Sequence, residues 1–118
     1  MKEKFIKVIV VTKDKIQVKR IENNLKSLQE IVEGYIECFD IKDNHTIICN
    51  EEGKIMNLEP NLYVIHKGII IEILCGNLII CNVDKNGEFA SLTDEEIEIL
   101  KNNYDFMLCR EVEIWNIK

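Results

Sequence analysis

Polar side chains that could bind a small ligand gather around the end of the first of two identical four-residue runs. The runs are Ile-Ile-Cys-Asn at 47–50 and at 79–82, and each leads into acidic residues and a glycine. An aromatic ring with a few directed hydrogen-bonding groups is typical of a small-molecule pocket. The alternative is that the asparagines close turns by hydrogen bonding to their own backbone. The predicted ligand-binding residues are Tyr35, Glu37, Asn50, Glu51 and Asn61.

The second run is followed by acidic residues at the spacing of a calcium loop. Asp84, Asn86, Glu88 and Glu95 occupy positions 1, 3, 5 and 12 of that pattern. Position 6, where glycine has to make the sharp turn, is Phe89, so the pattern fails where its geometry is decided. We therefore expect a turn followed by a helix cap at this place, and no calcium.

The sequence contains no pattern typical of catalysis or of a zinc site. Its two histidines and five cysteines lack the local spacing of zinc ligands. A Gly-x-Ser-x-Gly motif, a phosphate-binding loop and a dinucleotide fingerprint are all missing. His45 and His66 fall in predicted turns, where we expect exposed histidines without a role. We predict no catalytic residue, no metal and no cofactor.

Length and cysteine content indicate one domain in a reducing compartment. A chain of 118 residues buries enough surface to fold without metal or disulfide support, so we predict a single domain over residues 1–118. The cysteines lie in apolar runs and form no Cys-x-x-Cys pair, which is typical of reduced core thiols. The apolar run near the N-terminus is short and has no cleavage site. We expect a cytoplasmic protein with no membrane partner.

Charge is distributed unevenly along the chain. Residues 1–20 hold seven basic and two acidic side chains, and the other 98 hold eight basic and nineteen acidic ones, which gives +5 and −11 and the total of −6. The net charge argues against nucleic-acid binding, since phosphate affinity depends on cations. The first hairpin could still form a local basic patch. The alternative is that its lysines only protect exposed strands from edge pairing.

Apolar periodicity predicts the elements that position these residues. Pro60 cannot lie in a central strand, so 54–68 is predicted to be an irregular connection. The segment 35–41 is apolar on both faces, which favours a central strand. The element order indicates an α+β fold, with a mostly antiparallel sheet of about six to seven strands and two helices packed on it. The predicted strands are 5–11, 15–21, 35–41, 45–50, 69–74, 78–83 and 110–117.

The first helix is predicted from a change of period after residue 22. Asn23 or Asn24 is the expected N-cap, and Gly34 is the expected C′ residue. Its apolar face is predicted to contain Leu25, Leu28, Ile31 and Val32.

The second helix carries a complete start signature. Thr93 is the predicted N-cap, Glu96 completes a capping box, and Leu92 is placed to pack on Ile97. Its buried face is predicted to contain Ile97, Leu100 and Tyr104.

The chain resembles the domain of unknown function 3846 family in three stretches. They are SLQEIVEGYIE (27–37), CNEEGKIMNLEPN (49–61) and GNLIICNVDKNGEFASLTDEEI (76–97). The chain departs from the family pattern at Glu33, where a second glycine is common, and at Glu59, where a proline pair is usual. The resemblance implies a small protein of bacteria, phages or conjugative elements, often encoded among accessory genes, with no established activity. The matching positions are Leu28, Gln29, Gly34, Tyr35, Ile36, Glu37, Asn50, Glu51, Glu52, Gly53, Lys54, Leu58, Asn61, Gly87, Phe89, Leu92 and Thr93.

Small acidic accessory proteins without catalytic motifs commonly act by binding. We therefore expect a non-catalytic binding protein of a phage or mobile element that inhibits a bacterial defence system. It would either block a host defence protein or sequester a nucleotide-derived signal. The chain could also form a homo-oligomer.

Two alternatives involve nucleic acid. The first is an acidic mimic of nucleic acid, which requires the carboxylates of 94–98 with Glu111 and Glu113 to form one stripe. The second is a nucleic-acid-binding module that uses Lys13, Lys15 and Lys19 of the basic hairpin.

Overall fold

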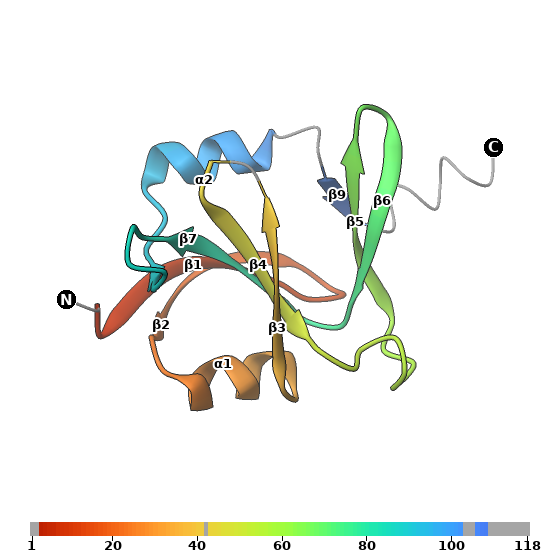
Figure 1. Ribbon diagram of the computed structural model, residues 1–118, viewed down its shortest axis with the longest axis horizontal. Helices are drawn as coiled ribbons and strands as arrows, with labels where there is room; N and C mark the ends of the chain where they lie inside the picture. Colours follow the sequence, from red (N-terminus) through yellow and green to blue (C-terminus); the bar gives the residue numbers. More distant parts are fainter. Residues whose placement is uncertain (1–2, 42, 103–105, 109–118) are drawn as a thin grey trace.

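The computed structural model describes residues 3–41, 43–102 and 106–108, which form two antiparallel sheets and two helices (Figure 1). The larger sheet has the order β2-β1-β7-β4-β3, with β8 paired to β7, and the smaller sheet has the order β6-β5-β9. The predicted α+β class with a mostly antiparallel sheet is confirmed. The strands are β1 (Phe5–Val11), β2 (Ile16–Glu22), β3 (Ile36–Ile41), β4 (His45–Asn50), β5 (Pro60–His66), β6 (Ile69–Cys75), β7 (Leu78–Val83), β8 (Phe89–Ala90) and β9 (Phe106–Leu108).

The middle of the larger sheet is buried on both faces, because β1, β7 and β4 carry apolar residues at successive positions. One face, with Ile47, Cys49 and Ile80, packs against the smaller sheet and α2. The other face, with Ile48 and Ile79, packs against α1. The two Ile-Ile-Cys-Asn runs lie side by side in antiparallel register, with Ile47 opposite Ile80 and Ile48 opposite Ile79. Their asparagines therefore stand at opposite ends of the same strand pair.

Helix α1 (Leu25–Val32) begins where the sequence predicts. The side chain of Asn24 accepts a hydrogen bond from the Ser27 N–H, which satisfies one of the free amides of the first turn. Leu28 and Val32 are buried against the sheet. Leu25, at the start of the predicted apolar face, is 56% exposed, because the buried part of that face begins one turn into the helix.

The end of α1 differs from the prediction. Glu33, and not Gly34, takes the left-handed conformation, with φ 64°. The Gly34 N–H donates to the Gln29 carbonyl at 3.1 Å, which completes the C-terminal cap. Gly34 is needed for another reason: a Cβ atom there would lie 2.6 Å from Nδ2 of Asn50. The glycine lets Asn50 approach the helix end.

Helix α2 (Asp94–Lys101) confirms the predicted start signature. Thr93 and Glu96 form both hydrogen bonds of the capping box. Leu92 and Ile97 are buried in the same apolar cluster, as is Leu100. The predicted contribution of Tyr104 and the predicted strand 110–117 lie outside the described residues.

Two strand predictions were wrong. Residues 60–66 form β5 in place of an irregular connection, and β5 lies between β6 and β9. Pro60 is tolerated because it is the first residue of β5 and pairs only with Cys75 of β6. Strand β3 is an edge and not a central strand. Its two apolar faces are explained by Phe39 and Ile36, which pack partly buried against opposite faces of the sheet.

The two sheets and α2 share one apolar cluster. Leu62, Val64 and Leu74 of the smaller sheet meet Leu78 of β7 and Leu100 of α2. The smaller sheet therefore covers one face of the larger sheet, beside α2 (Figure 1). Within the described ranges, neither helix is long and apolar enough to cross a membrane.

Candidate functional site

Asn50, the last residue of β4, organises the turn that follows it. Its Oδ1 accepts the Glu52 N–H at 2.8 Å, and its backbone carbonyl accepts the Gly53 N–H at 3.2 Å. Its Nδ2 donates to the carbonyls of Val32 at 3.1 Å and Glu33 at 3.2 Å. The side chain thus ties the turn to the end of α1, and all its strong hydrogen-bonding groups are used within the fold.

A pocket of about 230 Å³ lies between this turn and strand β6. Its walls come from Glu37 of β3, residues 49–51 and 53–55, and residues 72–75 of β6. Strand β6 is an edge of the smaller sheet and β3 is an edge of the larger one. The pocket is therefore formed where an edge of each sheet faces the turn after β4.

The charged groups of the pocket wall are mainly acidic. Three carboxylates, from Glu37, Glu51 and Glu72, accompany a single ammonium group, that of Lys54. Lys54 Nζ lies 2.6 Å from Glu72 Oε1. The hydrogen bond from Lys54 lowers the pKa of Glu72 against the opposing effect of burial, and the Ile73 N–H assists. The same hydrogen bond raises the pKa of Lys54, so the pair stays ionised at neutral pH.

Two buried thiols, Cys49 and Cys75, also line the pocket. Burial raises the pKa of Cys49 to about 11, and nearby carboxylates, Glu37 first, add to this effect. Burial likewise raises the pKa of Cys75. Both thiols are protonated at neutral pH, whereas the thiolate is the nucleophile and the metal ligand. In the part of the chain that the structure describes, no group of three histidine, cysteine or carboxylate side chains could hold a metal ion.

The structure brings together three of the five predicted ligand-binding residues. Glu37, Asn50 and Glu51 line the pocket. Tyr35 is 67% exposed and is not part of the wall, although its carbonyl accepts the Glu51 N–H at 2.8 Å. Asn61 lies elsewhere, where its amide donates to the carbonyls of Val11 at 3.0 Å and Gly76 at 2.9 Å. Whether any of the five binds a ligand stays a prediction.

Sequence reasoning missed the contribution of Lys54 and β6 to the pocket. Glu72 is the only charged residue in the run Ile-Ile-Ile-Glu-Ile-Leu-Cys. A lone charge in an apolar strand was a signal that could have identified it, since such a group needs a partner.

The other end of the strand pair carries a second polar cluster. The Nδ2 of Asn82 donates to the Ser91 carbonyl at 3.0 Å and to Glu96 Oε1 at 2.8 Å. Its Oδ1 lies 2.5 Å from Nδ1 of His45. Because the amide nitrogen is committed to two acceptors, this oxygen accepts, and Nδ1 of His45 carries the proton. The prediction that His45 is exposed in a turn was wrong: it begins β4 and is buried.

This second cluster holds α2 onto the sheet. Burial opposes ionisation of Glu96, but hydrogen bonds from the Thr93 N–H and the Asn82 amide, with His45 3.9 Å away, outweigh it and lower its pKa. The buried groups satisfy one another, so the cluster explains stability and leaves no open binding group among those named.

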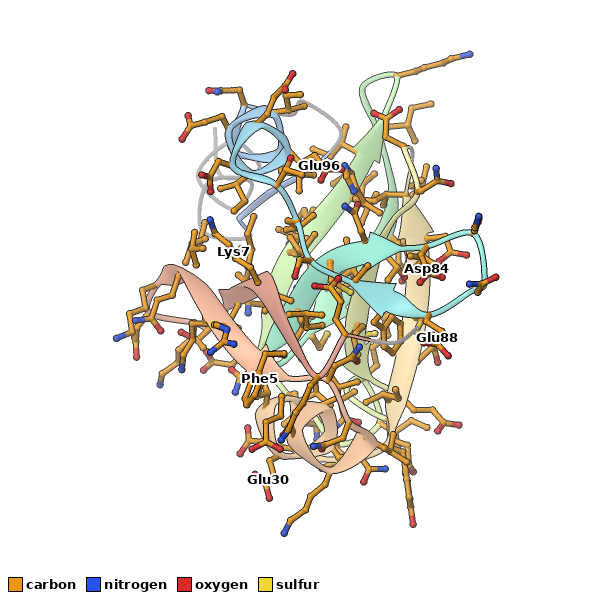
Figure 2. The ribbon with its side chains drawn as sticks, turned by 90° about the vertical axis from the view of Figure 1, so that its left-hand side faces the viewer. Phe5, Lys7, Glu30, Asp84, Glu88 and Glu96 are labelled. Atoms are coloured by element: carbon orange, nitrogen blue, oxygen red, sulfur yellow. The ribbon has the colours of Figure 1, made fainter. Side chains whose placement is uncertain are left out.

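The turn between β7 and β8 accounts for the residues that resemble a calcium loop. Oδ1 of Asp84 accepts the N–H groups of Asn86 at 2.8 Å and Glu88 at 3.0 Å. Figure 2 shows Asp84 and Glu88 at the two ends of this turn. The side chain and the backbone of Asp84 close the turn, which leads to the cap of α2, as predicted.

Fold and pocket together describe an α+β domain of two antiparallel sheets with a small acidic pocket between two strand edges. The sequence profile of the domain of unknown function 3846 family matches residues 6–105, and the chain belongs to this family. No curated protein and no solved structure matches the chain.

Proposed function

We propose that the chain is a non-catalytic binding protein that attaches to a protein partner and blocks it. The observation that carries this proposal is the apolar rim of the pocket. Ile55, on the pocket wall, is 80% exposed, and the neighbouring Met56 is 51% exposed. Two adjacent exposed apolar side chains beside a concavity are the kind of anchor that protein interfaces use.

The rim is held in shape before any partner arrives. The Met56 N–H donates to the Glu52 carbonyl at 2.8 Å, and the Leu58 N–H donates to the Gly53 carbonyl at 2.9 Å. Asn57, directly after the two apolar residues, takes a left-handed conformation with φ 57°. A loop fixed in this way loses little conformational entropy on binding.

Charge and size favour a protein over a nucleotide as the occupant. Three carboxylates face one lysine that is already bonded to Glu72, so the wall repels phosphate. The volume of about 230 Å³ is also below the roughly 300–1,000 Å³ of typical small-ligand pockets. Of the two predicted modes of inhibition, blocking a protein is therefore better supported than sequestering a nucleotide-derived signal.

The family resemblance supports the biological setting of this proposal. A member encoded among accessory genes of a phage or conjugative element would act in the cytoplasm of the bacterial host. The partner we propose is accordingly a host defence protein.

The acidic-mimic alternative has less support from the residues described. Asp94 is ion-paired to Lys7, and Glu96 is hydrogen-bonded to Asn82. Two members of the 94–98 run are thus engaged within the fold, while Glu111 and Glu113 lie outside the described residues.

Affinity capture from host cells tests the proposal. The full chain is compared with Ile55→Asp and with a matched control, Leu25→Asp, which changes a 56% exposed leucine on α1. We expect the wild type and Leu25→Asp to retain the same host protein and Ile55→Asp to lose it. Equal capture by all three, or no specific capture, would overturn the proposal.

A further inference from the structure

Strand β2 is an edge of the larger sheet. It pairs with β1 in seven consecutive residue pairs, from Phe5 with Glu22 to Val11 with Ile16, without a bulge. It is the outermost strand in the sheet order, so no strand among the described residues pairs with its other side. Alternate residues along such a strand present unpaired N–H and C=O groups, which can template another strand.

The exposed side chains along this edge include apolar and cationic groups, with one carboxylate, that of Glu22, at its end. Ile16 is 47% exposed and Val18 is 44% exposed, and the register places both on the same face as Arg20. The Arg20 guanidinium stacks 4.3 Å from the centre of the Phe5 ring, which holds it beside the strand. Lys19 is exposed on the opposite face.

Three lysines of the β1–β2 hairpin have no ion-pair partner among the residues that the structure describes. They are Lys13, Lys15 and Lys19, whereas Lys7 is ion-paired with Asp94. The hairpin, residues 5–22, holds five basic and two acidic side chains, a charge of +3 in a chain of −6. The hairpin is therefore a cationic region on an anionic molecule.

We propose that the β2 edge binds an extended acidic segment of a partner protein as an additional strand. Lysines on an edge repel another cationic strand, but the same charges attract an anionic one. The exposed β-branched side chains of Ile16 and Val18 supply the cross-strand contacts that a purely protective edge would lack. The opposite edge, β3, exposes Glu37 and Asp40 and would reject such a segment.

Charge and shape favour an acidic strand over nucleic acid. Single-stranded nucleic acid binds by stacking bases on exposed aromatic rings. The ring of Phe5 is occupied by Arg20, and Lys4 lies 5.8 Å from its centre. The edge thus offers backbone hydrogen bonds and aliphatic side chains in place of a stacking surface.

Peptide titration tests this inference. The probe is a fluorescent Val-Glu-Val-Glu-Val-Glu-Val peptide, compared with its Lys-for-Glu version and with the acidic peptide N-methylated at alternate backbone nitrogens. We expect only the unmodified acidic peptide to bind, since N-methylation removes the hydrogen bonds of strand addition and leaves the charge unchanged. Hydrogen exchange should slow at alternate amides of β2. Equal binding of the methylated peptide, or no binding, would overturn the inference.

Variants of the full chain locate the binding surface. Lys19→Glu with Arg20→Glu should weaken the acidic peptide about tenfold or more, which corresponds to about 1.4 kcal/mol. Lys26→Glu with Lys85→Glu makes the same charge change at exposed sites on α1 and in the β7–β8 turn, and should have little effect. Equal weakening by both pairs, or tighter binding of single-stranded DNA than of the peptide, would contradict strand addition. Ile55→Asp should bind the peptide as the wild type does. Loss of peptide binding at β2 can therefore be distinguished from loss of partner capture at the pocket rim.

Discussion

The two ends of the β4–β7 pair begin from the same four residues and serve different purposes. At one end, Asn50 binds the backbone of α1 and of the following turn, and a pocket with an apolar rim results. At the other end, Asn82 binds the side chains of His45 and Glu96, and α2 closes over it. The comparison teaches that each repeated run builds a central strand with both faces buried. The segment that follows the run decides whether that end of the strand pair borders a pocket or is covered by a helix.

The largest expected effect of a single change is at the open end. Asn50→Ala would leave the carbonyls of Val32 and Glu33 and the Glu52 N–H without their partner, at a site where Asn50 is only 6% exposed. We expect the free energy of unfolding to fall by about 3 kcal/mol. Urea denaturation measures this, and a loss below about 1 kcal/mol would show that Asn50 does not hold the turn to α1.

Asn82→Ala should cost about 2 kcal/mol in the same assay, since it removes two donated hydrogen bonds and the acceptor of His45. The closed end is expected to affect stability alone. Partner capture should therefore persist for the folded Asn82→Ala protein. Loss of capture without unfolding would mean that the two ends do not differ in function.

Glu96→Gln tests the closed end through the pH dependence of the free energy of unfolding. The folded-state pKa of Glu96 lies below its ordinary value of 4.5, so its ionised form stabilises the fold above about pH 4.5, and this contribution is lost as pH falls through the folded pKa. Glutamine also suits a capping box, so the difference at neutral pH should be about 1 kcal/mol or less. Unfolding measured from pH 7 to pH 3 should show that difference shrinking. A difference that grows toward acid would reverse the assigned role.

Lys54→Met, in the pocket wall, should lower the free energy of unfolding by a smaller amount. The Lys54 side chain is 63% exposed, and exposed ion pairs contribute about 0.2–1 kcal/mol. We expect a loss within that range in urea denaturation, and smaller still at high salt. A larger loss would mean that the pair is a structural element of the pocket.

Nucleotides should not stabilise the chain against thermal unfolding. Because the wall is acidic, we expect cyclic nucleotides and ADP-ribose derivatives to leave the melting temperature unchanged. A rise that Lys54→Met abolishes would revive the sequestration of a nucleotide-derived signal.

Local signals in the sequence predicted much of the fold. The capping box of Thr93 and Glu96 and the Asn24 cap depend on neighbours in the chain, and both are confirmed. Strand β5 was missed because the rule for Pro60 applies to the interior of a strand and not to its first residue. The position of β3 at the edge depends on long-range pairing, which its own composition does not reveal.

The site was only partly predictable, for a similar reason. Glu51 and Asn50 are close in sequence, and Glu37 lies on the neighbouring strand, so they were grouped correctly in space. Asn61 is near Asn50 in sequence but lies against Val11 of β1, because β5 begins the smaller sheet. Glu72 joins the pocket only through the packing of one sheet edge against the other.

The central claim is that the chain binds its partner at the end of the β4–β7 strand pair that carries Asn50. The most direct test is hydrogen exchange on the chain bound to its captured partner. We predict slower exchange in 51–57 and 72–75, which form the rim and wall of the pocket, and unchanged exchange in 84–96 at the closed end. Slower exchange confined to 84–96, with 51–57 unaffected, would contradict it.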